Sequence, residues 1–309
     1  MSTAAPPQKA PPPREQTGGR LSNGAFALLL AAPGLALFAA IICYPLLSAL
    51  FTGFFRQDLR LPGREFVGLD NFAHWLDGDF LTILEQTLTF TVGATLVPFV
   101  IGFALALALN TGLKGGGFLR GLFLFPWVIP GVVVSFLWMW IFNANYGVLN
   151  GLLMEAGILD ESVAWLGRPG TAMLAVIVTK TWASFPWMMV MLLAGLQTVP
   201  RELHEAASMD GAGSIRRFFA VTWPQVRGVA SIVLLLEFIW NFQHFDTIYV
   251  LTGGGPAGTT ETFATAVYQT AFKGFDIGRA TALGGLWMLL LLLLVAVYLR
   301  ITERKGDAR

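Results

Sequence analysis

The stretch Leu286-Trp-Met-Leu-Leu-Leu-Leu-Leu-Leu-Val295 decides the class of fold, because no soluble domain would tolerate so long an uncharged apolar run. It lies in one of several segments that are long and apolar enough to cross a bilayer. Of the 309 residues, 55% are hydrophobic and only 13% are charged. We therefore predict an all-α polytopic membrane protein with spanning helices at residues 25–52, 86–110, 118–142, 171–197, 228–251 and 281–300.

The two ends of the chain differ from this apolar body. Residues 1–24 are rich in Pro and poor in core-forming residues, which predicts a disordered tail. Residues 25–302 form the predicted transmembrane domain, and 303–309 a short C-terminal tail. Cys43 is the single cysteine, so an internal disulfide and a thiolate metal site are excluded. We expect neither a metal site nor a catalytic cluster.

The distribution of basic residues predicts the orientation. With the N-terminus inside, thirteen of the 20 Lys and Arg residues fall in inner segments and six in outer ones. The twentieth, Lys180, lies within a span. This bias places both termini in the cytoplasm. The net charge is only +1, and nothing in the sequence indicates nucleic-acid binding.

A polar loop at residues 200–227 separates the fourth and fifth spans and faces the cytoplasm in this orientation. Pro200 suits the start of a short helix, Gly211 permits a turn, and Ser214 suits the cap of a second helix. Two helices can be joined by far fewer residues. The loop is thus either a folded element that a soluble partner binds or a solvated amphipathic connector.

The spacing within the loop closely resembles the EAA loop of the permease subunits of binding-protein-dependent ABC importers. Glu205-Ala-Ala is followed after three residues by Gly211 and after twelve more by Pro224. Other blocks resemble the sugar-importing branch, and they occur in the right order: Phe66-Val-Gly-Leu-Asp-Asn-Phe72, Phe125-Pro-Trp-Val-Ile-Pro130, Tyr146-Gly-Val-Leu-Asn150, Leu193-Ala-Gly-Leu-Gln197 and Tyr249-Val-Leu-Thr-Gly-Gly-Gly-Pro256. The last block resembles the larger maltose permease subunit. Trp223 departs from the leucine usual in the family.

The resemblance implies a subunit of a larger machine in a bacterial cytoplasmic membrane. Its partners would be a second permease subunit in a heterodimer, two ATPase subunits and an extracytoplasmic binding protein. The chain would not itself be an enzyme, because ATP and Mg would be bound by the ATPase chains. The residues implied to couple to the ATPase are Glu205, Ala206, Ala207, Asp210, Gly211 and Pro224.

The stretch nearest to a phosphate-binding loop in sequence is residues 253–260, which begins with Gly253-Gly254-Gly255-Pro256. The stretch lacks the lysine that a phosphate loop needs, and it lies on the outer side in the predicted orientation. We interpret it as a flexible outer loop that reaches toward the binding protein or the substrate path.

Polar and aromatic residues inside the spans are candidates for the substrate path, because polar groups are costly in lipid. Their helical spacing puts Glu237, Trp240, Asn241 and His244 on one face of the fifth span, and Lys180, Ser184 and Trp187 on one face of the fourth. An aromatic ring beside polar groups suits a sugar. The alternative is that these residues join helices, which we favour for Lys180 and Glu237, expected to form a pair.

Three rival functions stay open at this point. The same machinery could import glycerol phosphate esters or a polyol, although Lys180 is the only basic residue deep in a span. A proton-coupled secondary transporter could use Glu237 and His244 as a relay, but this leaves the 200–227 loop unexplained. The third rival, a membrane enzyme, is unsupported, because the sequence shows no acid–base or metal cluster.

Overall fold

The structure, a computed structural model, describes residues 23–111 and 115–306. Of the predicted tail at residues 1–24, residues 1–22 lie outside the described residues, as do residues 112–114 and 307–309, while residues 23 and 24 begin a helix. The chain divides into two units, residues 1–49 and 50–309. Within the described residues, five helices are long and apolar enough to cross a membrane, or six if one bent pair counts as a single span.

The first unit is a single apolar helical segment. It contains α1 (Asn23–Phe38), the π-helical turn η1 (Ala39–Cys43) and the start of α2 (Tyr44–Thr52). Phe26–Thr52 is 27 residues long, and a stretch of 18 residues within it has a mean hydropathy of 2.5. At a rise of ~1.5 Å per residue, this length is sufficient to cross a bilayer.

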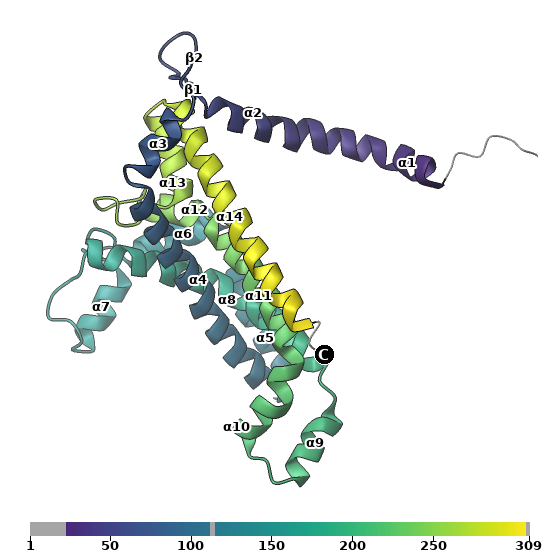
Figure 1. The fold of residues 1–309 in the computed structure, drawn as a ribbon. Helices are drawn as coiled ribbons and strands as arrows, with labels where there is room; N and C mark the ends of the chain where they lie inside the picture. The colour runs from purple at the N-terminus through teal and green to yellow at the C-terminus, as the bar shows by residue number, and fades with distance from the viewer. Residues whose placement is uncertain (1–22, 112–114, 307–309) are drawn as a thin grey trace, which may run out of the picture. The chain divides into compact units, whose positions relative to one another are not determined.

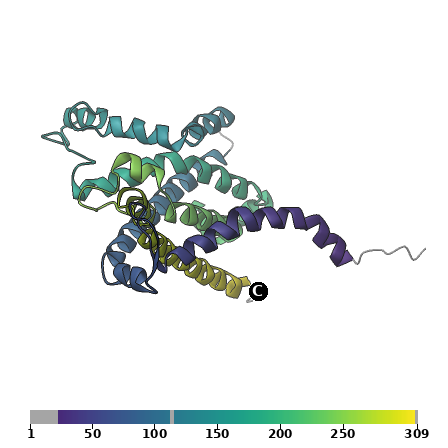
Figure 2. The same cartoon turned by 90° about the horizontal axis from the view of Figure 1, so that it is seen from above.

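The centre of the second unit is built on α4 (Phe80–Leu109), α8 (Pro169–Gln197) and α11 (Trp223–Phe242), which pack together in both views (Figures 1 and 2). The approach of α4 to α8 is close at Gly102. A Cβ atom there would lie 2.9 Å from the backbone N of Met189 and from the carbonyl O of Phe185. Small residues that let helix backbones approach are typical of membrane helix interfaces.

A second packing cluster joins α14 (Ile277–Gly306) to α3 (Asp70–Leu76), α13 (Phe263–Tyr268) and the π-helical η3 (Gln269–Lys273). Trp75, Phe263 and Leu283 are buried in it. The indole Nε1 of Trp75 donates to the carbonyl O of Arg279 at 2.8 Å. The start of α14 is thereby fixed to α3.

The segment predicted as one span at 118–142 is two helices, α5 (Gly116–Val128) and α6 (Gly131–Ile141), bent by 92°. Ile129 is extended, with φ −74° and ψ 133°, because it precedes Pro130. The short helix α7 (Val148–Glu155) follows. Its Asn150 side chain binds the backbone of Val163 and the indole of Trp165.

The fifth predicted span is also divided. The helix α11 ends at Phe242, and a separate helix, α12 (Asp246–Leu251), packs against α6. The all-α prediction omitted a small antiparallel hairpin, in which β1 (Phe55–Arg56) pairs with β2 (Glu65–Phe66). The hairpin lies beside the start of α14, where the backbone N–H of Ile277 donates to the carbonyl O of Gln57.

Candidate functional site

The 200–227 loop forms a helix, a turn and a second helix. The first helix, α9 (Arg201–Met209), begins after Pro200. The second, α10 (Ser214–Arg217), continues through the π-helical η2 (Phe218–Thr222) into α11, so that Ser214–Phe242 is one helix of 29 residues. The turn after α9 therefore leads directly into the central helix α11 (Figure 1).

Gly211 ends α9 in a left-handed turn, with φ +74°. Its N–H donates to the carbonyl O of Ser208 at 3.0 Å, and the N–H of Ala212 donates to that of Ala207 at 3.0 Å. This pair of bonds is a Schellman motif, which requires a left-handed residue after the helix and favours glycine there. The turn fixes the angle between α9 and the helix that follows.

The outer face of this loop is open. Glu205, Ala206, Asp210 and Gly211 are exposed, while Ala207 is half-buried. Met209 is 89% exposed and Ile215 is 78% exposed. Large apolar side chains exposed together mark a surface that another protein can cover.

Pro224 and Trp223 lie where the loop enters the bundle. Pro224 is half-buried and has no N–H to donate within the helix. The N–H of Trp223 donates to the carbonyl O of Phe218, five residues earlier, which closes the π-helical turn before the proline. The Trp223 ring lies 6.2 Å from the ring of Phe103 in α4. Trp223 thus ties the loop to α4.

Lys180 and Glu237 form the pair expected from the sequence. Their Nζ and Oε1 atoms are 3.8 Å apart, and the Glu237 side chain is only 3% exposed. Asn241 extends this link, because its Nδ2 donates to the carbonyl O of Ala94 at 2.9 Å and to Oγ1 of Thr95 at 3.1 Å. Asn241 is buried and joins α11 to α4, as an interhelical tie does.

The two aromatic candidates, Trp187 of α8 and Trp240 of α11, come together. The rings of Trp187 and Trp240 lie 5.0 Å apart. Trp240 is 46% exposed, whereas Ser184 is buried. Trp187 is buried, so the open indole face of the pair is that of Trp240. Such a face can cover the C–H surface of a sugar ring.

His244 does not share the helical face predicted for it, because α11 ends at Phe242. Its Nε2 atom lies 2.9 Å from Oγ1 of Thr247 and 3.4 Å from the backbone N of Thr247, at the start of α12. The ring stacks on Phe90 at 5.8 Å. His244 therefore organises the break between α11 and α12.

The Gly253-Gly254-Gly255-Pro256 stretch is a compact loop, contrary to the flexible loop expected. Gly254 is buried and has φ +91°. The carbonyl O of Gly253 accepts from Nε2 of Gln269 at 2.7 Å, and that of Gly255 accepts from Oγ1 of Thr260 at 2.7 Å. The first bond holds the loop against η3, and the second closes the loop on itself.

Sequence reasoning missed the polar residues of α4. Thr87, Thr91 and Thr95 are all buried. Their four-residue spacing on an apolar helix was a signal for them. Oγ1 of Thr91 has no hydrogen-bond partner among the described residues. The described residues also contain no group of His, Cys, Asp or Glu side chains that could hold a metal ion.

Known proteins are similar to the chain over most of its length. The family model described as "Binding-protein-dependent transport system inner membrane component" matches residues 99–305. The sulfoquinovosyl glycerol transport system permease protein SmoG of Agrobacterium fabrum is 36% identical, over 92% of each chain. The trehalose/maltose transport system permease protein MalF of Thermococcus litoralis is 34% identical, over 90% of this chain and 94% of the relative.

A third relative and one solved structure are also similar to the chain. The sn-glycerol-3-phosphate transport system permease protein UgpA of Agrobacterium fabrum is 32% identical, over 92% of this chain and 96% of the relative. A chain from the crystal structure of a bacterial ABC transporter involved in alginate import has a TM-score of 0.76 and 22% identity. That match covers 90% of this chain and 94% of the other, and shows a shared fold.

Proposed function

Because this chain belongs to the family of binding-protein-dependent transport system inner membrane components, we propose that it is a permease subunit that imports a sugar with energy from ATP. An extracytoplasmic binding protein delivers the sugar. A sister permease completes the pore, and two ATPase subunits drive it from the cytoplasm. Both termini and the α9 loop face the cytoplasm of the bacterial cell.

The observation that carries this proposal is the exposed helix α9, ended by Gly211 and continuous in chain with α11. Glu205, Asp210 and Met209 project from it into solvent. When an ATPase subunit binds this helix and moves it, α11 moves as well. Glu237, Trp240 and Asn241 lie in the last turns of α11. A passive connector has no need of a fixed turn or of exposed apolar side chains.

A sugar is the cargo best supported. Two relatives carry the names of trehalose/maltose and sulfoquinovosyl glycerol permeases, and both cargoes contain sugar rings. In this chain Trp240, packed on Trp187, offers an exposed aromatic face, and Ser184 lies three residues before Trp187 in α8. We assign Trp187, Trp240 and Ser184 to the substrate path.

Glycerol phosphate esters are the second candidate, because one relative is named for sn-glycerol-3-phosphate transport. A phosphate in the pore needs a cation that is free to meet it. Lys180 lies in the middle of α8, and Glu237 already neutralises its charge. The pore therefore favours a neutral sugar over a phosphate ester.

The test measures uptake by cells in which the chromosomal gene has been deleted and then restored on a plasmid. Labelled trehalose, maltose and glycerol 3-phosphate are supplied separately. We expect restored uptake of a sugar, which vanadate abolishes and a protonophore does not. Restored uptake that follows the proton gradient would contradict the proposal and support a secondary transporter.

A further inference from the structure

Helix α4 lacks one of its own backbone hydrogen bonds near the middle of its length. Pro98 is buried in α4 and has no N–H, so the carbonyl O of Ala94, four residues earlier, cannot accept the usual helical bond. In a membrane-spanning helix such a carbonyl needs another donor, because lipid offers none. The missing bond therefore has to come from a neighbouring helix or from water.

The donor is a side chain of α11. Nδ2 of Asn241 lies 2.9 Å from the carbonyl O of Ala94 and 3.1 Å from Oγ1 of Thr95. Ala94 and Asn241 are both buried, so bulk solvent does not compete for this bond. A residue of α11 thus replaces the hydrogen bond that Pro98 removes from α4.

Helices α4 and α8 lie in register on both sides of this point. A Cβ atom on Gly93 would lie 2.7 Å from Cδ1 of Ile177, and a Cβ atom on Gly102 would lie 2.9 Å from the carbonyl O of Phe185. Pro98 lies between these two contacts along α4. It is therefore level with the stretch of α8 that the same contacts enclose.

This stretch of α8 has the same interruption. Pro186 lies one residue beyond it and removes the helical donor to the carbonyl O of Trp182. Lys180, which pairs with Glu237 of α11, lies in the stretch as well. The hydrogen-bond ladders of α4 and α8 are thus both interrupted in the layer where α11 is joined to them.

The two halves of α4 are anchored to different parts of the chain. On the outer side of Pro98, Oγ1 of Thr87 accepts from the N–H of Phe263 in α13 at 3.1 Å. On the inner side, the ring of Phe103 packs on Trp223, where the 200–227 loop enters the bundle. Helix kinks concentrate at prolines. A displacement of the inner anchor relative to the outer one is therefore absorbed at Pro98.

We propose that residues 94–98 are a hinge of α4 and that Asn241 is the positioning residue that sets its angle. This inference rests on the proposed function, in which the α9 loop drives α11. When α11 moves, Asn241 carries the carbonyl of Ala94 with it, and α4 bends at Pro98 without breaking a bond of its own ladder. Trp240 precedes Asn241 directly, so the bend and the proposed substrate path move together.

A double-mutant cycle on the thermal unfolding of the complete transporter tests the pairing. Asn241→Leu lowers the thermal midpoint, because it leaves the carbonyl of Ala94 unpaired. Pro98→Ala supplies an N–H that bonds to the same carbonyl. In the Pro98→Ala background, the loss caused by Asn241→Leu should therefore shrink by about half or more. An unchanged loss would overturn the pairing.

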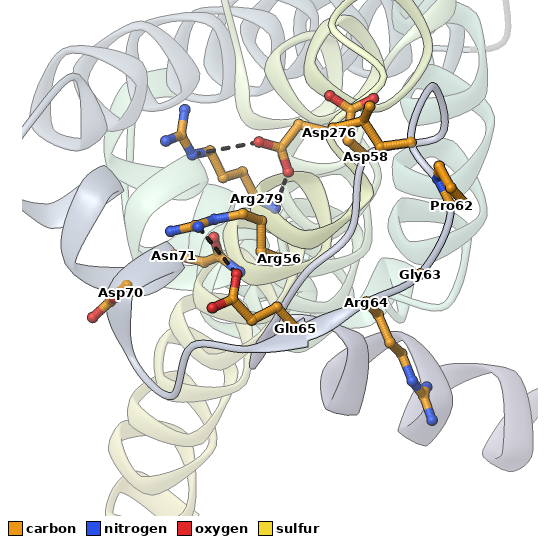
Figure 3. A pocket seen from close by; sticks show the side chains of 11 residues that line it. Arg56, Asp58, Pro62, Gly63, Arg64, Glu65, Asp70, Asn71, Asp276 and Arg279 are labelled. Carbon is orange, nitrogen blue, oxygen red and sulfur yellow. Dashed lines mark hydrogen bonds and ion pairs between the residues drawn. The ribbon is translucent and has the colours of Figure 1, made fainter.

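Asn71→Leu is the matched control. The side-chain amide of Asn71, at the hairpin shown in Figure 3, is also buried and donates to backbone carbonyls, those of Gly53 and Phe55, at 2.9 Å each. Neither carbonyl belongs to α4, so Pro98→Ala should leave the effect of Asn71→Leu unchanged. An equal reduction for both asparagines would overturn the pairing, because Pro98→Ala would then act only through general stability.

Uptake by the complete transporter in liposomes tests the hinge. With Pro98→Ala the thermal midpoint should be equal or higher, because the ladder is closed. The maximal rate should fall about fivefold, because each bend now breaks a backbone hydrogen bond. A residue that only supports the fold would change stability and rate in the same direction. Pro98→Val supplies the same N–H with a larger side chain, and it should lower the rate as well.

The outcomes separate the hinge from the proposed function. Uptake at the wild-type rate by both Pro98→Ala and Pro98→Val would overturn the hinge and leave the proposed function standing. Absence of uptake by the wild type, with the ATPase, ATP and loaded binding protein present, would overturn the proposed function and the hinge with it.

Discussion

The Nζ atom of Lys180 lies 3.8 Å from Oε1 of Glu237, which joins α8 to α11 through an ion pair that is nearly closed to solvent. Asn241 lies one turn further along α11, and its Nδ2 is 3.4 Å from the same Oε1 atom. The pair and the amide together link α4, α8 and α11. Any movement of α11 driven from the α9 loop must either carry these helices along or break this link.

Removal of one charge from the pair should therefore harm both stability and transport. Lys180→Met or Glu237→Gln leaves an unpaired polar group in the bundle, at a cost of about 3–5 kcal/mol. Thermal unfolding in detergent should show a lower midpoint, and uptake should fall. Arg56→Met is the control, because its exposed pair with Glu65 is worth about 0–1 kcal/mol.

Exchange of the two charges tests the pair itself. Lys180→Glu combined with Glu237→Lys should recover part of the stability and uptake that the single reversals lose. If the double variant is no better than the worse single one, the two residues act separately and the link between α8 and α11 is not electrostatic.

Gly211→Val should uncouple transport while the protein still reaches the membrane. A β-branched residue at φ +74° strains the turn and costs roughly 1–2 kcal/mol, so the angle of α9 changes. Uptake should fall at least about tenfold, with the amount of permease on immunoblots unchanged. Gly213→Ala is the control, because Gly213 has φ −65° and open space around it.

Glu205→Lys tests the exposed face of the same helix without touching the turn. Reversal of this charge should reduce co-purification of the ATPase and abolish uptake. Full uptake by Glu205→Lys and by Gly211→Val would show that the loop is passive.

Gly102→Ala should destabilise the contact between α4 and α8. The added Cβ lies 2.9 Å from backbone atoms that cannot rotate away, and overpacking of this kind costs about 1–3 kcal/mol. The thermal midpoint should fall. Gly228→Ala in α11 meets no atom within 4 Å and should leave the midpoint equal or higher. Equal midpoints for the two variants would refute the close contact.

Glu261 should make stability depend on pH. Partial burial and, second, the Asp79 carboxylate raise the pKa of Glu261 in the folded state. The folded state then binds more protons than the unfolded state, so stability falls as pH rises from the unfolded pKa of about 4.3 through the raised folded pKa. Glu261→Gln should have a higher thermal midpoint than wild type at pH 8, and the difference should vanish at pH 4. A difference that is the same at both pH values would contradict this.

Much of the fold could be read from the residues because hydropathy and helical spacing are local properties. The Lys180–Glu237 pair followed from the depth of each residue along its helix, and the turn of α9 followed from the spacing to Gly211. Both depend on distances along a helix, which the 3.6-residue period fixes. The division of residues 118–142 at Pro130 was visible as a proline, but the size of the bend depends on packing.

The break after Phe242 could not be predicted in the same way. No proline or glycine marks it, and His244 fits the helical pattern of Glu237 and Asn241. Its ring instead stacks on Phe90 of α4 and bonds to Thr247. These contacts come from residues distant in sequence or from the next helix, and they outweigh the local preference. The β1–β2 hairpin likewise depends on its contacts with α3 and α14.

The most direct test of the account is transport by purified components in liposomes. The permease and its sister subunit are reconstituted with and without the ATPase subunits, ATP and the sugar-loaded binding protein. The account predicts that sugar enters only when all components are present, and that Gly211→Val abolishes entry. Accumulation of sugar by the permease subunits alone, driven by a proton gradient, would contradict it.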